Sequence, residues 1–132
     1  MIHLDTNFLI DALVPGSAQD AQLTGWLGAG ETLGISVIAW GEFLCGPLSP
    51  AAEALARRPF PDAVALERTD AGKAAELFNL TGRRSKSYTD RCIGAVAIRA
   101  QAPLATSNRD DFTPIIPHDW CWPKPGQQEL SL

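Results

Sequence analysis

Carboxylates stand at four places where the surrounding sequence is apolar. Asp5 follows the run IHL, and Glu42 lies inside ISVIAWGEFLCG. Asp90 opens the stretch TDRCIGAVAIRA, and the pair Asp110 and Asp111 precedes a phenylalanine. Converging carboxylates repel one another, which raises their pKa values unless a cation lies between them. Mg²⁺ or Mn²⁺, which prefer oxygen ligands, would relieve that repulsion and could activate water against a phosphodiester. A metal would also let an acidic site serve an acidic substrate, because it inverts the local charge.

Each carboxylate also has an ordinary structural explanation. Asp5 could cap the first helix, as Asp does well. Glu42 could lie on the exposed stripe of its helix. Asp90 is the third residue after Ser87, which is the spacing of a capping box, and Asp111 could form an Asx turn. Three of the four positions nevertheless fall where strands end or helices begin, which is the same side of an α/β sheet.

Apolar runs and helical patterns alternate along the chain. Strands are expected at residues 2–4, 33–37, 64–66 and 104–106, with a last extended piece at 115–122. Helices are expected at 8–13, 17–27, 36–44, 49–56, 70–80 (capped by Thr69 or Asp70) and 88–100, and SNRDDF is expected to be a loop. The crossovers are long enough for parallel pairing. The predicted fold is therefore α/β, a three-layer α/β/α sandwich with a short, mainly parallel sheet.

The predicted domain comprises residues 1–122, followed by a polar tail at 123–132. In a fold of this class polar chemistry collects at the carboxyl ends of the strands. Asp5 and Asn108 would both lie there, after the first and the fourth strand. The four acidic positions are thus expected at one edge of one sheet.

The net charge of −4 and a pI near 5.0 argue against a broad nucleic-acid-binding surface, which would be basic. The positive charge is uneven, however, because four basic residues fall within nine positions: Arg83, Arg84, Lys86 and Arg91. This segment could position phosphates locally, or it could be a solvated helix end.

Three widely spaced cysteines without a CxxC pair indicate a reduced, cytoplasmic protein. No apolar run approaches the roughly 18–20 residues of a membrane span, and no secretory leader is visible at the N-terminus. His3 and His118 have no close Cys or His neighbours, so a zinc site is not expected.

The motifs LDTNFLID, the isolated Glu42, TDRCIGAVAIRA and LATSNRDDF, in that order, resemble a PIN-domain ribonuclease. The closest resemblance is to VapC-type toxins of bacterial toxin–antitoxin pairs, and it extends from Ile2 to Phe112. It implies a PIN-like fold and Mg²⁺-dependent endonucleolytic cleavage of RNA, with Mn²⁺ as a substitute. It also implies a cognate antitoxin and a homodimer.

The resemblance assigns roles to individual residues. The catalytic carboxylates would be Asp5, Glu42, Asp90 and Asp111, and the metal would be held by these four and Asn108. Thr6, Asn7 and Thr106 would support the ligands by hydrogen bonding. Asn108 is a weaker ligand than an aspartate, so a second metal could bind loosely or only with substrate, and Asp110 is an extra carboxylate beside the motif. Arg83, Arg84, Lys86 and Arg91 would contact RNA.

Two other functions fit parts of the sequence. A haloacid dehalogenase-like phosphohydrolase needs a second aspartate two residues after the first, where this chain has Asn7. A non-catalytic acidic α/β binding module, with all its carboxylates as helix caps, would need no metal, so metal-induced stabilisation separates it from a nuclease.

A partner surface is also expected. Five large apolar residues lie in or near the helices after the second strand, too many for one small core: Trp40, Phe43, Leu44, Leu55 and Phe60. Some of this surface should be covered by a second copy or by an antitoxin segment.

Overall fold

The first strand, β1 (Ile2–Leu4), lies inside a parallel sheet and is followed directly by Asp5. The computed structural model describes residues 1–60, 62–84, 87–116 and 120–122. Its sheet has the order β2-β1-β3-β4, and every neighbouring pair is parallel. The strands are short: β1 (Ile2–Leu4), β2 (Leu33–Gly34), β3 (Leu104–Ala105) and β4 (Cys121–Trp122).

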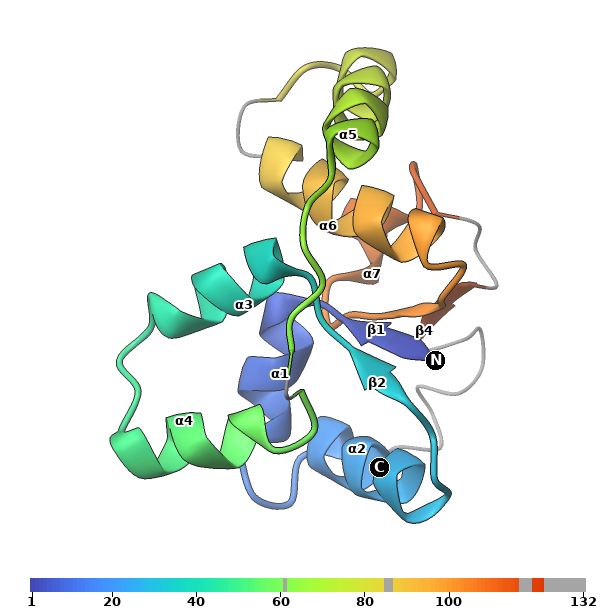
Figure 1. Ribbon diagram of the computed structural model, residues 1–132. Helices are drawn as coiled ribbons and strands as arrows, with labels where there is room; N and C mark the ends of the chain where they lie inside the picture. The colour runs from blue at the N-terminus through green and yellow to red at the C-terminus, as the bar shows by residue number, and fades with distance from the viewer. Residues whose placement is uncertain (61, 85–86, 117–119, 123–132) are drawn as a thin grey trace.

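Helices cover both faces of this sheet (Figure 1). The described residues form α1 (Thr6–Ala12), α2 (Ala18–Gly28), α3 (Val37–Leu44), α4 (Pro50–Arg57), α5 (Arg68–Leu80), α6 (Tyr88–Arg99) and α7 (Arg109–Phe112). The first four lie on one side of the sheet, where α1 packs against α2 and α3, while α6 packs against α5 and α7 on the other. The predicted α/β/α fold is confirmed.

Serines begin three of these helices, as their positions in the sequence predict. The hydroxyl oxygens of Ser17, Ser36 and Ser49 each accept a hydrogen bond from the backbone N–H three residues later, at 2.9–3.1 Å. Such a bond satisfies one of the free N–H groups of the first turn. Ser36 matters most for the site, because its helix carries Glu42.

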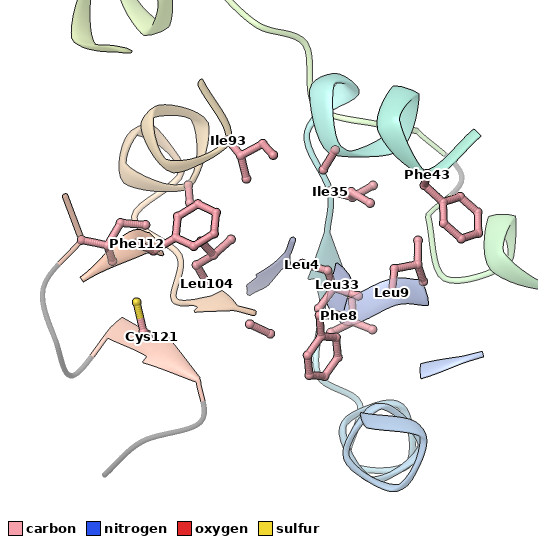
Figure 2. Packing of buried hydrophobic residues seen from close by; sticks show 14 of the residues in the cluster. Leu4, Phe8, Leu9, Leu33, Ile35, Phe43, Ile93, Leu104, Phe112 and Cys121 are labelled. Atoms are coloured by element: carbon pink, nitrogen blue, oxygen red, sulfur yellow. The ribbon is translucent and has the colours of Figure 1, made fainter. Parts of the chain in front are cut away.

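Buried apolar side chains fill both interfaces between the helices and the sheet. Phe112 of α7 packs beside Leu104 of β3, while Phe8 and Leu9 of α1 lie on the other side of the sheet (Figure 2). The ring of Phe8 also contacts those of Trp26 and Trp122, with centroids 5.7 and 5.1 Å apart. Together these contacts anchor α1 and α7, the two helices that follow β1 and β3.

The structure corrects four of the predicted elements. Residues 64–66 form no strand, because Val64 makes only a single bridge to Ser36. The helix α5 begins at Arg68, so Asp70 lies inside its first turn, where its carboxylate accepts from the N–H of Glu67 (2.9 Å) and pairs with Arg99 (2.9 Å). Residues 109–112 of the expected loop are helical, and of the last extended piece only residues 121–122 form a strand.

The five apolar residues named for a partner surface divide between the core and the surface. Phe43 and Phe60 are buried in the core. Leu44 and Leu55 are 40% and 55% exposed, and Trp40 is half-buried against Phe43.

All three cysteines are free, with Cys92 and Cys121 buried and Cys45 exposed. No helix among the described residues has both the length and the apolar character needed to cross a membrane. His118 and the predicted tail at 123–132 lie outside the described residues.

Gly34 allows β2 to approach a buried histidine of β1. His3 is almost fully buried, and burial lowers its pKa to about 4, with smaller contributions from Arg99 and the N-terminal amine. Its Nε2 has no hydrogen-bond partner within the described part of the chain. A Cβ atom at position 34 would lie 2.7 Å from this Nε2.

We therefore expect Gly34→Ala to lower the free energy of unfolding by about 1–3 kcal/mol, because the enclosed imidazole has no room to move. Gly72→Ala is the matched control: a Cβ there meets no atom within 4 Å in the middle of α5, so alanine should stabilise by up to about 1 kcal/mol. Denaturant unfolding measures both changes, and equal effects would contradict the steric explanation.

Candidate functional site

Asp5 is fixed at the carboxyl end of β1 by contacts to both neighbouring elements. Its N–H donates to the carbonyl oxygen of Ala105 (2.9 Å), which continues the pairing with β3. Its carboxylate is 3% exposed and accepts from the N–H of Thr6 (2.7 Å) and from the hydroxyl of Thr106 (2.9 Å). Asp5 is thus the N-cap of α1, as one alternative predicted. Its second oxygen is bonded to a residue 101 positions away, which a simple cap does not require.

Glu42 reaches the same place from α3. The hydroxyl of Thr6 donates to its Oε1 (2.8 Å), so Thr6 bonds to two carboxylates, that of Asp5 through its N–H and that of Glu42 through its hydroxyl. The Glu42 side chain is otherwise exposed, which leaves its second oxygen accessible. Thr6 therefore hydrogen-bonds to Glu42, whereas Asn7 is exposed on the first turn of α1 and outside these hydrogen bonds.

Asp90 lies half-buried in the first turn of α6. The alternative in which it forms a capping box with Ser87 is wrong, since Ser87 has helical backbone angles and makes no side-chain cap. The Ser87 hydroxyl instead donates to the carbonyl oxygen of Arg84 (2.6 Å). Asp90 is thus left without that structural role.

The DD pair stands on the short helix α7, behind Thr106. The hydroxyl of Thr106 both donates to Asp5 and accepts from the N–H of Asn108 (3.0 Å), which fixes the start of the loop against the strand end. Asn108, Asp110 and Asp111 are exposed, and Asn108 precedes α7 without a side-chain cap bond.

The pKa values show that four carboxylates lie within each other's fields. Burial raises the pKa of Asp5 to about 6, and the charges of Glu42 and Asp111 add to the shift, against the hydrogen bonds from Thr106 and Thr6. Burial likewise raises the pKa of Asp90 to about 6, together with the charges of Asp5, Asp111 and Glu42, while the Arg91 guanidinium opposes it. Of the DD pair it is Asp111 whose charge acts on both groups.

A cavity of about 360 Å³ lies beside these carboxylates. It is lined by Thr81, Arg84, Ser87, Asp90, Arg91, Asp110, Asp111 and Pro114. Of the predicted RNA-binding residues, Arg83 and Arg84 are exposed, whereas Arg91 is 5% exposed and Lys86 is outside the described residues. The sequence did not predict that Arg91 is buried, because nothing in the basic run distinguishes a buried arginine from an exposed one.

The donor chemistry suits a hard divalent cation, because carboxylate oxygens are the ligands that Mg²⁺ and Mn²⁺ prefer. Asp5 is held rigidly, and a cation would relieve the repulsion that raises the pKa values of Asp5 and Asp90. Among the described residues, no three His, Cys, Asp or Glu side chains are gathered closely enough to hold a metal as they stand. The side chains of Glu42 and Asp111 are exposed at this site.

The PIN domain family model matches residues 2–114. The chain belongs to the PIN domain family. This confirms the family that the motifs predicted and removes the haloacid dehalogenase-like alternative.

Solved structures with the same fold are similar over most of this PIN domain. A toxin–antitoxin complex from Klebsiella pneumoniae matches with a TM-score of 0.72 and 24% identity, covering 92% of this chain and 95% of the other. The structure of FitAB bound to an IR36 DNA fragment matches with a TM-score of 0.61 and 19% identity, covering 86% and 90%. No curated protein sequence matches significantly.

The raised pKa values predict how the metal-free PIN domain responds to pH. Between pH 3.8 and about 6 the folded state holds more protons on Asp5 than the unfolded state does, so stability falls as the pH rises through this window. In EDTA at pH 8, Asp5→Asn should therefore be more stable than wild type by roughly 1–3 kcal/mol, and this advantage should vanish below pH 4.

Thermal melts with EDTA and with Mg²⁺ measure this effect. Added Mg²⁺ should stabilise wild type by binding the folded state, and should stabilise Asp5→Asn much less. Asp110→Asn, on the exposed side of α7, is the control and should behave as wild type. If Asp5 is only a cap, the mutant loses up to roughly 1 kcal/mol at pH 8 and Mg²⁺ has no effect, as expected for a non-catalytic binding module.

Proposed function

We propose that this PIN domain is a Mg²⁺-dependent endoribonuclease that hydrolyses RNA phosphodiester bonds. The observation that carries the proposal is that the charges of Glu42 and Asp111 act on both Asp5 and Asp90, although the four carboxylates come from four separate elements. The alternative that explained Asp90 as part of a capping box loses support, because Ser87 makes no side-chain cap bond. Asp5 does cap α1, but its second carboxylate oxygen also accepts from Thr106, which a cap does not require. Membership of a family of nucleases supports the same conclusion.

The carboxylates have different tasks in this proposal. Asp5, Glu42, Asp90 and Asp111, with Asn108 as a weaker neutral donor, would hold the cation. When bound, Mg²⁺ or Mn²⁺ supplies an activated water and neutralises charge on the phosphodiester. Thr106 and the N–H of Thr6 keep Asp5 in one orientation, and the Thr6 hydroxyl does the same for Glu42. Preorganised ligands of this kind reduce the cost of binding the ion.

RNA would approach over the cavity next to Asp90 and Asp111. Arg84 lines this cavity, and Arg83, the preceding residue, is exposed, so both can contact phosphates. With a net charge of −4, affinity for RNA should depend on these local contacts and on the metal. Lys86 belongs to the same basic segment.

We further propose that the chain is the VapC-like toxin of a cytoplasmic toxin–antitoxin pair. A solved structure with the same fold is a toxin–antitoxin complex. The apolar surface around Leu44 and Leu55, and an apolar groove of about 350 Å³ between α1, α2 and α4, support an antitoxin segment or a second copy as partner. The three unpaired cysteines fit a reducing compartment.

The proposal is tested with the purified protein on single-stranded RNA, with Mg²⁺ or with EDTA. Asp5→Asn, Glu42→Gln and Asp90→Asn should each remove nearly all cleavage while remaining folded, because metal ligands act as a unit. Circular dichroism checks the folding of each variant, and full activity in Asp5→Asn would exclude a metal nuclease.

The DD pair provides a second test. Asp111→Asn should reduce cleavage more than Asp110→Asn, because the Asp111 charge acts on both Asp5 and Asp90. The two exposed aspartates are adjacent on α7, so each serves as the control for the other. If Asp110→Asn is the inactive variant, the assignment of the fourth carboxylate is off by one residue.

A further inference from the structure

Arg91 is a buried arginine that connects three helices beside the carboxylates. Its Nε donates to the hydroxyl oxygen of Thr81 (3.0 Å), the C-cap residue of α5. Its Nη1 donates to the carbonyl oxygen of Asp111 (3.1 Å) in α7. Thr81 is itself held, since its hydroxyl donates to the carbonyl oxygen of Leu77 (2.6 Å). One guanidinium on α6 thus links the end of α5 to α7.

The helix α7 needs such support. It has four residues, and a helix of that length is not stable by itself. Its preceding residue, Asn108, makes no side-chain cap bond, and only Phe112 within it is buried. Among the described residues, the contacts that hold Asp111 in position include Phe112 in the core, the N–H of Asn108 on Thr106, and Arg91 on the Asp111 carbonyl.

We propose that Arg91 is a positioning residue that holds Asp111 within reach of Asp90 and Asp5; this rests on the proposed metal-nuclease function. Asp90 and Arg91 are consecutive residues of α6. One turn of this helix therefore presents the Asp90 carboxylate to the site and, through Arg91, fixes the backbone of Asp111. The bond from Arg91 goes to the carbonyl of Asp111 and not to its carboxylate. The Asp111 carboxylate therefore makes no hydrogen bond to Arg91 and stays available to a cation.

This role differs from contact with RNA, which the basic run alone suggested for Arg91. The side chain is 5% exposed and two of its nitrogen atoms already donate to protein acceptors. Loss of Arg91 should therefore weaken metal binding and the catalytic step, and should leave the KM for RNA unchanged. Loss of an RNA contact would do the opposite.

The experiment compares Arg91→Met and Arg91→Lys with Arg99→Met in the full chain. Arg99 is the matched control, an arginine at the other end of α6 that pairs with Asp70 (2.9 Å) and donates to the carbonyl of Ala65 (2.9 Å), away from the site. Mn²⁺ affinity is measured by titration calorimetry and cleavage as separate kcat and KM values.

We expect Arg91→Met to bind Mn²⁺ about 10-fold or more weakly and to lose a similar factor in kcat, as residues that support metal ligands usually do. Arg91→Lys, which keeps the charge but presents one compact ammonium in place of the guanidinium fork, should recover only part of the loss. Arg99→Met should lower stability while leaving Mn²⁺ affinity and KM unchanged. Wild-type Mn²⁺ affinity in Arg91→Met, or a raised KM alone, would overturn the proposal.

Amide hydrogen exchange tests the bond from Arg91 to the Asp111 carbonyl, called the tether below, without metal or substrate. Exchange at residues 109–112 should accelerate in Arg91→Met and not in Arg99→Met, and unchanged exchange in Arg91→Met would overturn the proposal. A wild type that binds no Mn²⁺ and cleaves no RNA would end the nuclease function, whereas the exchange result still decides on the tether. Should Arg91→Met fail to fold, Thr81→Val removes the acceptor of Nε and is expected to show the same changes more weakly.

Discussion

The parallel pairing of β1 with both β2 and β3 is the constraint on which the site depends. It brings the carboxyl ends of three strands to one edge of the sheet, where the chain turns into helices or loops. Because β1 has only three residues, Asp5 is reached at once, and its N–H extends the pairing to Ala105. Thr106, the next residue on that side, then meets the Asp5 carboxylate directly. The N–H groups of Thr6 and Asn108 donate to this pair.

The site holds like charges close together, which costs free energy that the packing of the rest of the fold offsets. Burial and mutual repulsion raise the pKa of both Asp5 and Asp90 to about 6, so the apo protein carries strained charges at neutral pH. Hydrogen bonds from two threonines offset part of this cost at Asp5, and Arg91 offsets part at Asp90. The packed faces of the sheet keep these groups in place, with Phe8 of α1 on one side and Phe112 of α7 on the other. The arrangement is one that cation binding would relieve.

Local patterns predicted much of the fold because local physics controls those elements. Ser17, Ser36 and Ser49 cap helices through bonds within four residues. Residues 64–66 look like a strand, but a strand requires a partner, and here only Val64 finds one. Asp70 was expected to be a possible cap, and it does accept from the N–H of Glu67 in a capping box, but it also pairs with Arg99, 29 residues away.

The same distinction explains what could be predicted about the site. Carboxylates at strand ends and helix starts are visible in the sequence, and their order matches a known family. The tether cannot be seen there, because Arg91 bonds to Thr81 and Asp111, 10 and 20 residues away. Nor does the string SNRDDF show that burial of Phe112 will stabilise a helical turn within it. Interactions that close over long sequence separations need the folded chain.

The long separation between Asp5 and Thr106 also determines when the site can exist during synthesis. Asp5 is made at the start, and its partner follows 101 residues later. At the usual ~5–20 residues per second, roughly 5–20 s pass between the translation of the two. For most of that interval the chain lacks α6, β3 and α7, so it has neither the Thr106 hydroxyl that fixes Asp5 nor the carboxylates of Asp90 and Asp111. The ribosome would thus finish most of the molecule before the proposed nuclease site could form.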